Sequence, residues 1–65
     1  MSAPKRFLVQ RLSTTSVSTW RTALATESKH EAEQCFMAHS THLRPGSSVR
    51  LLDSHQDLVL AKLTR

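Results

Sequence analysis

The chain has 65 residues, of which 38% are hydrophobic, and a formal net charge of +4 at neutral pH. A chain this short can bury one thin core, and its single cysteine excludes an internal disulfide and favours a reducing, cytoplasmic compartment. No stretch approaches the roughly 20 apolar residues that cross a bilayer, and Phe7-Leu8-Val9 is too brief for a signal-peptide core.

Two strands joined by a loop are predicted in the first part of the chain. Lys5–Leu12 carries β-compatible residues just after Pro4, and Trp20–Thr26 carries them again. Ser13–Thr19 is nearly all Ser and Thr, whose side chains compete with regular structure, so we expect a hairpin loop there. Residues 1–26 also lack acids, as organelle presequences do, but the strand pattern favours the folded interpretation.

One helix is predicted next. Ser28 and Glu31 have the spacing of a capping box, in which each side chain satisfies a free backbone N–H of the first turn. The helix should run from Lys29 to about His42, because Pro45 disfavours helical geometry in the residue before it. Its apolar face is expected to contain Ala32, Cys35, Phe36, His39 and Leu43.

A second hairpin follows, with strands at Ser48–Asp53 and Leu58–Leu63. The order predicts an α+β fold of ββαββ type, in which one helix packs on one face of a four-stranded, mostly antiparallel sheet within a single domain, 1–65. Whether the third strand lies beside the first or the second stays open. The predicted core contains Leu24, Ala32, Phe36, Leu43, Val49 and Leu51.

Both faces of the predicted sheet carry apolar residues, since Phe7 and Val9 alternate with Leu8 and Leu12 along the first strand. One helix covers one face, so the other face is expected to be a mixed apolar and basic interface. The alternative is that these are ordinary, singly exposed apolar side chains. The predicted partner-binding residues are Leu8, Leu12, Arg21, Arg50 and Leu60.

These features predict a small non-enzymatic module that binds a protein or associates with itself, as a homodimer, through the sheet face or an edge strand. The alternative is nucleic-acid binding on a basic sheet face; it rests on charge, because few aromatic residues are present. With Gly46 as its one glycine, the chain has no phosphate-binding loop. We expect no cofactor, no membrane association and no identifiable small-molecule substrate.

Cys35, His39 and His42 form a C-x3-H-x2-H pattern that is a weak candidate for a metal site, with a fourth ligand from His55 or His30. The favoured interpretation is a buried thiol and a histidine at the edge of the core. A nucleophilic Cys35 activated by His39 would still need an orienting third group and oxyanion donors, and none is identified. Catalysis is therefore not expected.

Three stretches of this sequence carry a resemblance to known proteins. They are Trp20, Thr22, Leu24 and Thr26; Glu31-Ala32-Glu33 with Phe36; and Val49-Arg50-Leu51-Leu52-Asp53. Together they resemble small uncharacterised bacterial proteins of the strand, helix and hairpin type, of the kind solved in structural-genomics surveys. The resemblance covers most of the chain and implies the ββαββ fold, but no activity, cofactor or catalytic residue.

Overall fold

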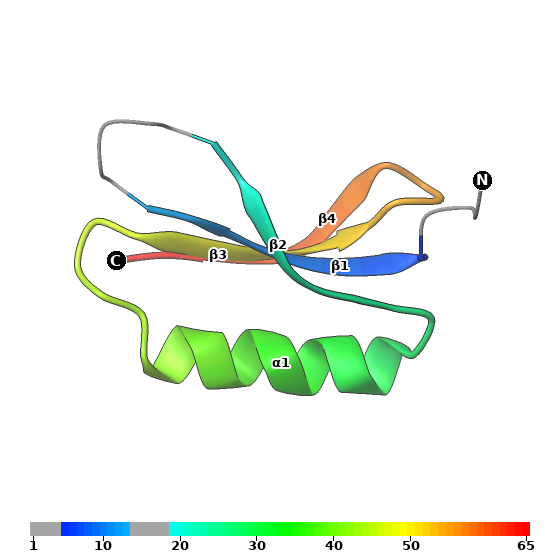
Figure 1. Cartoon of the computed structure of the whole chain (residues 1–65), viewed down its shortest axis with the longest axis horizontal. Coiled ribbons are helices and arrows are strands. Elements are labelled where there is room, and N and C mark those ends of the chain that lie inside the picture. Colours follow the sequence, from blue (N-terminus) through cyan, green and yellow to red (C-terminus); the bar gives the residue numbers. More distant parts are fainter. Residues whose placement is uncertain (1–4, 14–18) are drawn as a thin grey trace.

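The computed structural model describes residues 5–13 and 19–65, and it is a four-stranded antiparallel sheet with one helix packed against it (Figure 1). In chain order the elements are β1 (Phe7–Leu12), β2 (Arg21–Thr26), α1 (Lys29–Thr41), β3 (Ser48–Asp53) and β4 (Leu58–Thr64). The predicted ββαββ fold of the α+β class is confirmed. Most of the loop expected at Ser13–Thr19 lies outside the described residues.

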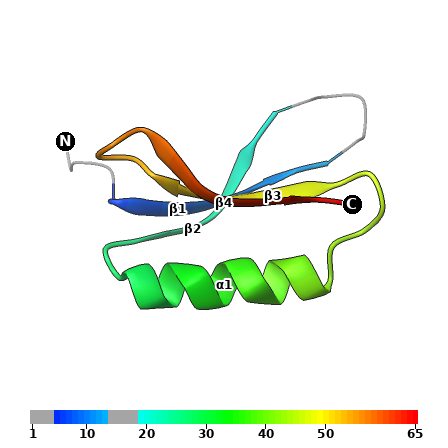
Figure 2. The same ribbon diagram turned by 180° about the vertical axis from the view of Figure 1, so that it is seen from behind.

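The strand order is β2-β1-β3-β4, so β3 lies beside β1 and the question left open by the sequence is settled. All three neighbouring pairs are antiparallel, and β2 and β4 are the two edge strands. Views from both sides show α1 along one face of the sheet, while the β1–β2 and β3–β4 hairpins rise away from it at opposite ends (Figure 1 and Figure 2). The other face is therefore not covered by the helix.

Each edge strand contains a β-bulge. In the β1–β2 pair the register shifts after Val9, which leaves Ala23 of β2 without a cross-strand partner. In the β3–β4 pair the register shifts after Leu51, which leaves Leu60 of β4 without one. An extra residue on one strand reverses the side of the sheet to which the residues beyond it belong. The bulges therefore decide which side chains share a face.

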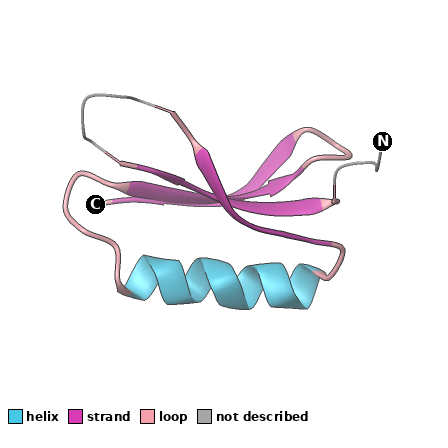
Figure 3. Ribbon diagram, in the orientation of Figure 1, coloured by secondary structure: helices cyan, strands magenta, loops and turns pink. Residues whose placement is uncertain are grey.

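Local hydrogen bonds set the helix bounds, which nearly match the predicted ones (Figure 3). The backbone N–H of Glu31 donates to Ser28 Oγ at 3.2 Å, as an N-cap requires. The N–H of Ser28 donates to Thr26 Oγ1 at 3.1 Å, so the end of β2 takes the role that the capping box assigns to the Glu31 carboxylate. The helix ends at Thr41, and Gly46 adopts a φ of 84° in the turn that follows.

The core lies between α1 and the two central strands, β1 and β3, and side chains of β2 and β4 pack at its margin. Its buried members are Phe7, Val9, Ala32, Leu43, Val49 and Leu51. Two of the predicted core residues, Leu24 and Phe36, pack against this cluster but stay partly exposed. Val9 and Val49 are fully buried on adjacent strands, so the centre of the core is the contact between β1 and β3.

A buried carboxylate ties the β3–β4 turn to the start of β1. Asp53 is 3% exposed, and its Oδ1 accepts hydrogen bonds from the backbone N–H groups of His55 (3.0 Å) and Gln56 (3.2 Å). Arg6 Nε donates to Oδ2 at 3.4 Å. Burial alone would raise the pKa of Asp53, but the two backbone hydrogen bonds and the charge of Arg6 outweigh it and lower the pKa. The ionised form therefore stabilises the turn.

Asp53→Asn is expected to reduce the acid sensitivity of the fold. A carboxyl with a lowered folded pKa contributes stability above its unfolded pKa, about 3.9, and loses it as the pH falls through the folded value. For the wild type, the urea concentration at the midpoint of unfolding should therefore fall when the pH is lowered below about 4. The variant should have a lower midpoint than the wild type at pH 6, and its midpoint should fall less on acidification. Asp57→Asn, in the same turn, should keep the wild-type drop; equal drops in wild type and Asp53→Asn would contradict the assignment.

Candidate interaction surface at the β4 edge

The exposed apolar side chains of this protein concentrate at one edge of the sheet. Among the described residues, the large hydrophobic side chains that are exposed are Met37 (66%), Leu58 (49%), Val59 (44%) and Leu60 (38%). Three of the four are consecutive on β4, an edge strand that pairs with β3 on one side and leaves its other side unpaired. An unpaired apolar edge is a template for pairing with another strand.

The fourth residue joins the same surface from the helix. Met37 and Phe36 of α1 line a hollow of about 330 Å³ together with Leu60 and Ala61 of β4. Lys29 and Glu33 of α1 also line this hollow, so one charge of each sign flanks it. We define the β4-edge surface as Phe36, Met37, Leu58, Val59 and Leu60.

Three of the five residues predicted to bind a partner lie together on the sheet face away from the helix. On that face Leu8 lies opposite Leu52 and belongs with Leu12 and Arg50. All of these side chains are half-buried, which limits the apolar area that they offer to a partner.

Arg21 and Leu60 do not lie on that face, and the two bulges explain the difference. Without the bulge at Ala23, Arg21 would lie opposite Leu12, which belongs to the outer face. With the bulge, Arg21 lies opposite Arg11, which belongs to the face that carries the core. The bulge at Leu60 likewise removes that residue from its place opposite Leu52 and puts it in the hollow beside α1. The expectation that both share the outer face is wrong.

The middle of the outer face is polar and cationic. Arg50 Nε donates to Gln10 Oε1 at 2.8 Å, and Gln10 Nε2 donates to Thr22 Oγ1 at 3.3 Å. The Arg50 guanidinium lies 4.2 Å from the ring centroid of Trp20, and Lys62 Nζ lies 5.9 Å from it. Trp20 was not among the predicted partner-binding residues; its position just before an edge strand and its identity as the sole tryptophan were the available signals.

The metal candidates do not form a ligand set. Among the described residues, no group of three or more His, Cys, Asp or Glu side chains is arranged to hold a metal ion, so Cys35, His39 and His42 are not brought together as three ligands. Cys35 was predicted to be a buried thiol; it packs against the core but stays partly exposed. Burial, and next the charge of Glu31 one turn earlier, raise the pKa of Cys35.

Cys35 is therefore expected to react slowly with thiol reagents at pH 7 to 8. The thiolate is the reactive species, and a raised pKa lowers its population, so alkylation by iodoacetamide should be several times slower than in the urea-unfolded chain. Glu31→Gln should accelerate the folded reaction by removing a nearby negative charge. Glu33→Gln removes the same charge from a position two residues before Cys35, which faces elsewhere, and should change the rate less. A folded rate equal to the unfolded rate would contradict this.

Within residues 5–13 and 19–65, no helix has the length and apolar character needed to cross a membrane. Comparisons with protein-family models, with curated proteins and with solved structures found no match for this chain.

Proposed function

We propose that this chain is a non-enzymatic interaction module that associates with a second copy of itself through the β4-edge surface. The observation that carries the proposal is the run of three exposed apolar residues, Leu58, Val59 and Leu60, on an unpaired edge strand. Natural edge strands are normally protected by charges, bulges or covering segments. The β4 strand has a bulge at Leu60 and one charged residue, Lys62. Neither places a charge among Leu58, Val59 and Leu60, so the first half of the strand is apolar.

A second copy fits this edge better than an unrelated strand, because two β4 strands can pair antiparallel about a twofold axis perpendicular to the sheet. Such pairing extends the sheet from four strands to eight and keeps both helices on the same side. Met37 and Leu60 of each copy then lie beside the junction, so apolar side chains of both α1 and β4 are removed from water.

The size of the chain supports the same proposal. A core of six buried hydrophobic residues offers little stability, and domains below about 70 to 80 residues commonly add disulfides, a metal or a second subunit. With one cysteine, this chain cannot form an internal disulfide. The lone thiol suits a cytoplasmic compartment, which we include in the proposal.

Light scattering coupled to size exclusion tests the proposal directly. Between about 1 μM and 1 mM protein, the mass should rise from the 7.3 kDa of one chain toward twice that value. Over the same series, amide hydrogen exchange at residues 58–61 should slow, because pairing protects the free edge, while exchange at residues 21–26 of the other edge strand should not change. A strict monomer at every concentration would overturn self-association.

A further inference from the structure

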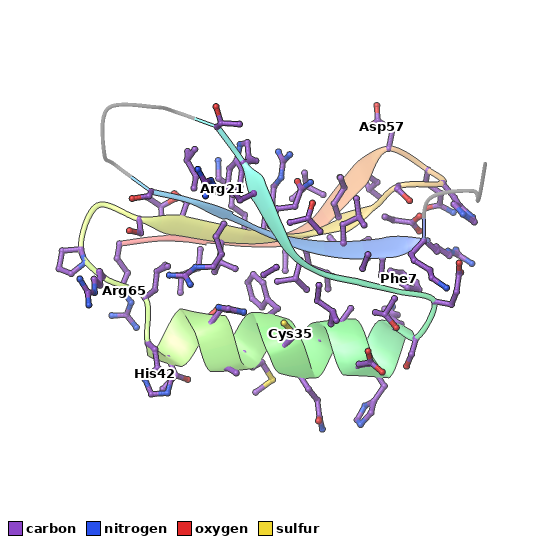
Figure 4. The ribbon with its side chains drawn as sticks, in the orientation of Figure 1. Phe7, Arg21, Cys35, His42, Asp57 and Arg65 are labelled. Carbon is purple, nitrogen blue, oxygen red and sulfur yellow. The ribbon has the colours of Figure 1, made fainter. Side chains whose placement is uncertain are left out.

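The charges of this protein are segregated between its two ends. The described residues include every one of the nine basic and five acidic side chains. All acidic residues lie at the end that contains the start of α1 and the β3–β4 turn: Glu27, Glu31, Glu33, Asp53 and Asp57. Six basic residues lie toward the opposite end: Arg11, Arg21, Arg44, Arg50, Lys62 and Arg65. Figure 4 shows this separation for Arg21 and Arg65 against Asp57.

The sum at each end follows from these lists. The end with the acidic residues also holds Lys5, Arg6 and Lys29, so its side chains sum to about −2, while those of the other end sum to about +6. The overall charge of +4 thus understates the positive field at the basic end. A field of this kind raises the local concentration of polyanions and accelerates their association.

Three of the six cations line a hollow at the basic end. It has a volume of about 820 Å³ and lies beside the start of β2, next to the loop that follows α1. Arg11, Arg21 and Arg44 line it, together with the hydroxyl-bearing residues Thr19 and Ser47. None of the three guanidinium groups forms an ion pair among the described residues, so their positive charges are free for a ligand.

The register between β1 and β2 brings two of these arginines close together, which destabilises the fold when no anion is bound. Arg11 and Arg21 lie directly opposite each other on β1 and β2, a cross-strand position at which like charges are destabilising. The bulge at Ala23 creates the pair, because an unbroken register would place Arg21 opposite Leu12. An anion held between the two guanidinium groups relieves the repulsion, and Arg is the side chain best suited to bind phosphate oxygens in pairs.

The residue next to Arg21 adds an aromatic surface. Trp20 is half-buried and has Arg50 at 4.2 Å and Lys62 at 5.9 Å from its ring centroid on the outer face. The start of β2 therefore has an arginine-lined hollow on one side and an aromatic ring among cations on the other. Phosphate-binding cations combined with an aromatic platform for bases characterise proteins that bind single-stranded nucleic acid.

We propose that the basic end binds single-stranded nucleic acid, with backbone phosphates in the hollow formed by Arg11, Arg21 and Arg44 and a base stacked on Trp20. An acidic protein segment would satisfy the arginines but would place no base on Trp20, whose ring already contacts Arg50. The site lies at the β2 side of the sheet, whereas the proposed self-association uses β4. Either proposal can therefore be wrong without affecting the other.

Fluorescence anisotropy with a labelled 12-nucleotide oligo-dT at about 50 mM salt measures the affinity, and Trp20, the sole tryptophan, reports stacking through its own emission. The double variant Arg21→Gln, Arg44→Gln should weaken binding about tenfold or more. It should also reduce the slope of log affinity against log salt by about 1.4, which corresponds to two lost phosphate contacts. The matched control, Lys5→Gln with Lys29→Gln, removes equal charge from the other end and should weaken binding less than twofold.

The double variant Arg21→Gln, Arg44→Gln should stay folded, because the loss of Arg21 removes a like-charge pair. An unchanged or raised thermal midpoint by circular dichroism verifies this. Trp20→Leu should weaken binding at least threefold, and Trp20 emission should be quenched when the oligonucleotide saturates the protein. Equal weakening by both double variants would overturn the proposal. So would unchanged Trp20 emission at saturation, or displacement of the oligonucleotide by polyglutamate as effective as displacement by unlabelled oligo-dT.

Discussion

Leu51→Ala is expected to unfold a large fraction of the protein at 25 °C. Leu51 is 3% exposed in β3, a central strand, and lies between Val9 of β1 and Ala61 of β4. Truncating a buried leucine costs about 2–5 kcal/mol, because the side chain loses its burial and leaves a cavity. A single core in a chain of this length rarely supplies more than about 3–5 kcal/mol in total. The substitution therefore removes most of the free energy of unfolding.

The neighbouring residue provides the matched control. Leu52 has the same side chain in the same strand but points to the outer face, where it is half-buried. Leu52→Ala should cost about 1 kcal/mol or less in the free energy of unfolding, since less apolar area is removed from water there. Urea unfolding monitored by far-ultraviolet circular dichroism measures both variants. Equal losses at the two positions would contradict the one-sided core.

The fold could be predicted because its signals are local. The N-cap at Ser28, the Pro45-Gly46 turn and the alternation within Ser48–Asp53 each act over a few residues, and the observed bounds follow them closely. The neighbour of β3 could not be predicted, because pairing with β1 depends on contacts about 40 residues apart in the chain. Phe7 and Val9, on the strand beside β3, belong to the core but were absent from the predicted core.

The site was harder to predict than the fold, and the bulges are the physical cause. A strand pattern read with period two assigns each residue to a face, but one inserted residue reverses the assignment for everything beyond it. The bulge at Ala23 places Arg21 opposite Arg11 and not opposite Leu12. The bulge at Leu60 places that residue in the hollow beside α1. Neither insertion leaves a glycine or another marker in the sequence.

The segregation of charge is a second feature that could not be predicted from the sequence. Along the chain the basic residues look evenly spread, which suggests a role in solubility. Antiparallel pairing brings Arg11 and Arg21, and likewise Arg50 and Lys62, to neighbouring positions near one end of the molecule. Segregation of charge is therefore a product of topology, and it becomes visible once the strand order and register are known.

Leu60→Lys is expected to weaken self-association by at least about tenfold. Each dimer contains the substitution twice, full burial of a leucine contributes about 1.5–3 kcal/mol, and 38% of Leu60 is left for a partner to cover, so two lost contacts amount to about 1–2 kcal/mol. Every 1.4 kcal/mol changes the dissociation constant tenfold. The two lysines also bring like charges together across the proposed junction. Because Leu60 is 38% exposed in one chain, the lysine that replaces it can extend its ammonium group into water in the monomer, whereas pairing of two β4 strands would cover it.

Ala25→Lys is the matched control, because it adds the same charge to an exposed position on the other edge strand, β2. Its dissociation constant should stay within about threefold of wild type, since an exposed charge on the edge opposite the junction is screened by salt and changes association little. Sedimentation equilibrium on all three proteins measures the constants. Leu12→Lys separates the edge from the outer face, where Leu12 lies. A dimer that survives Leu60→Lys and dissociates on Leu12→Lys would place the junction on the sheet face, because a lysine disrupts the surface on which it becomes buried.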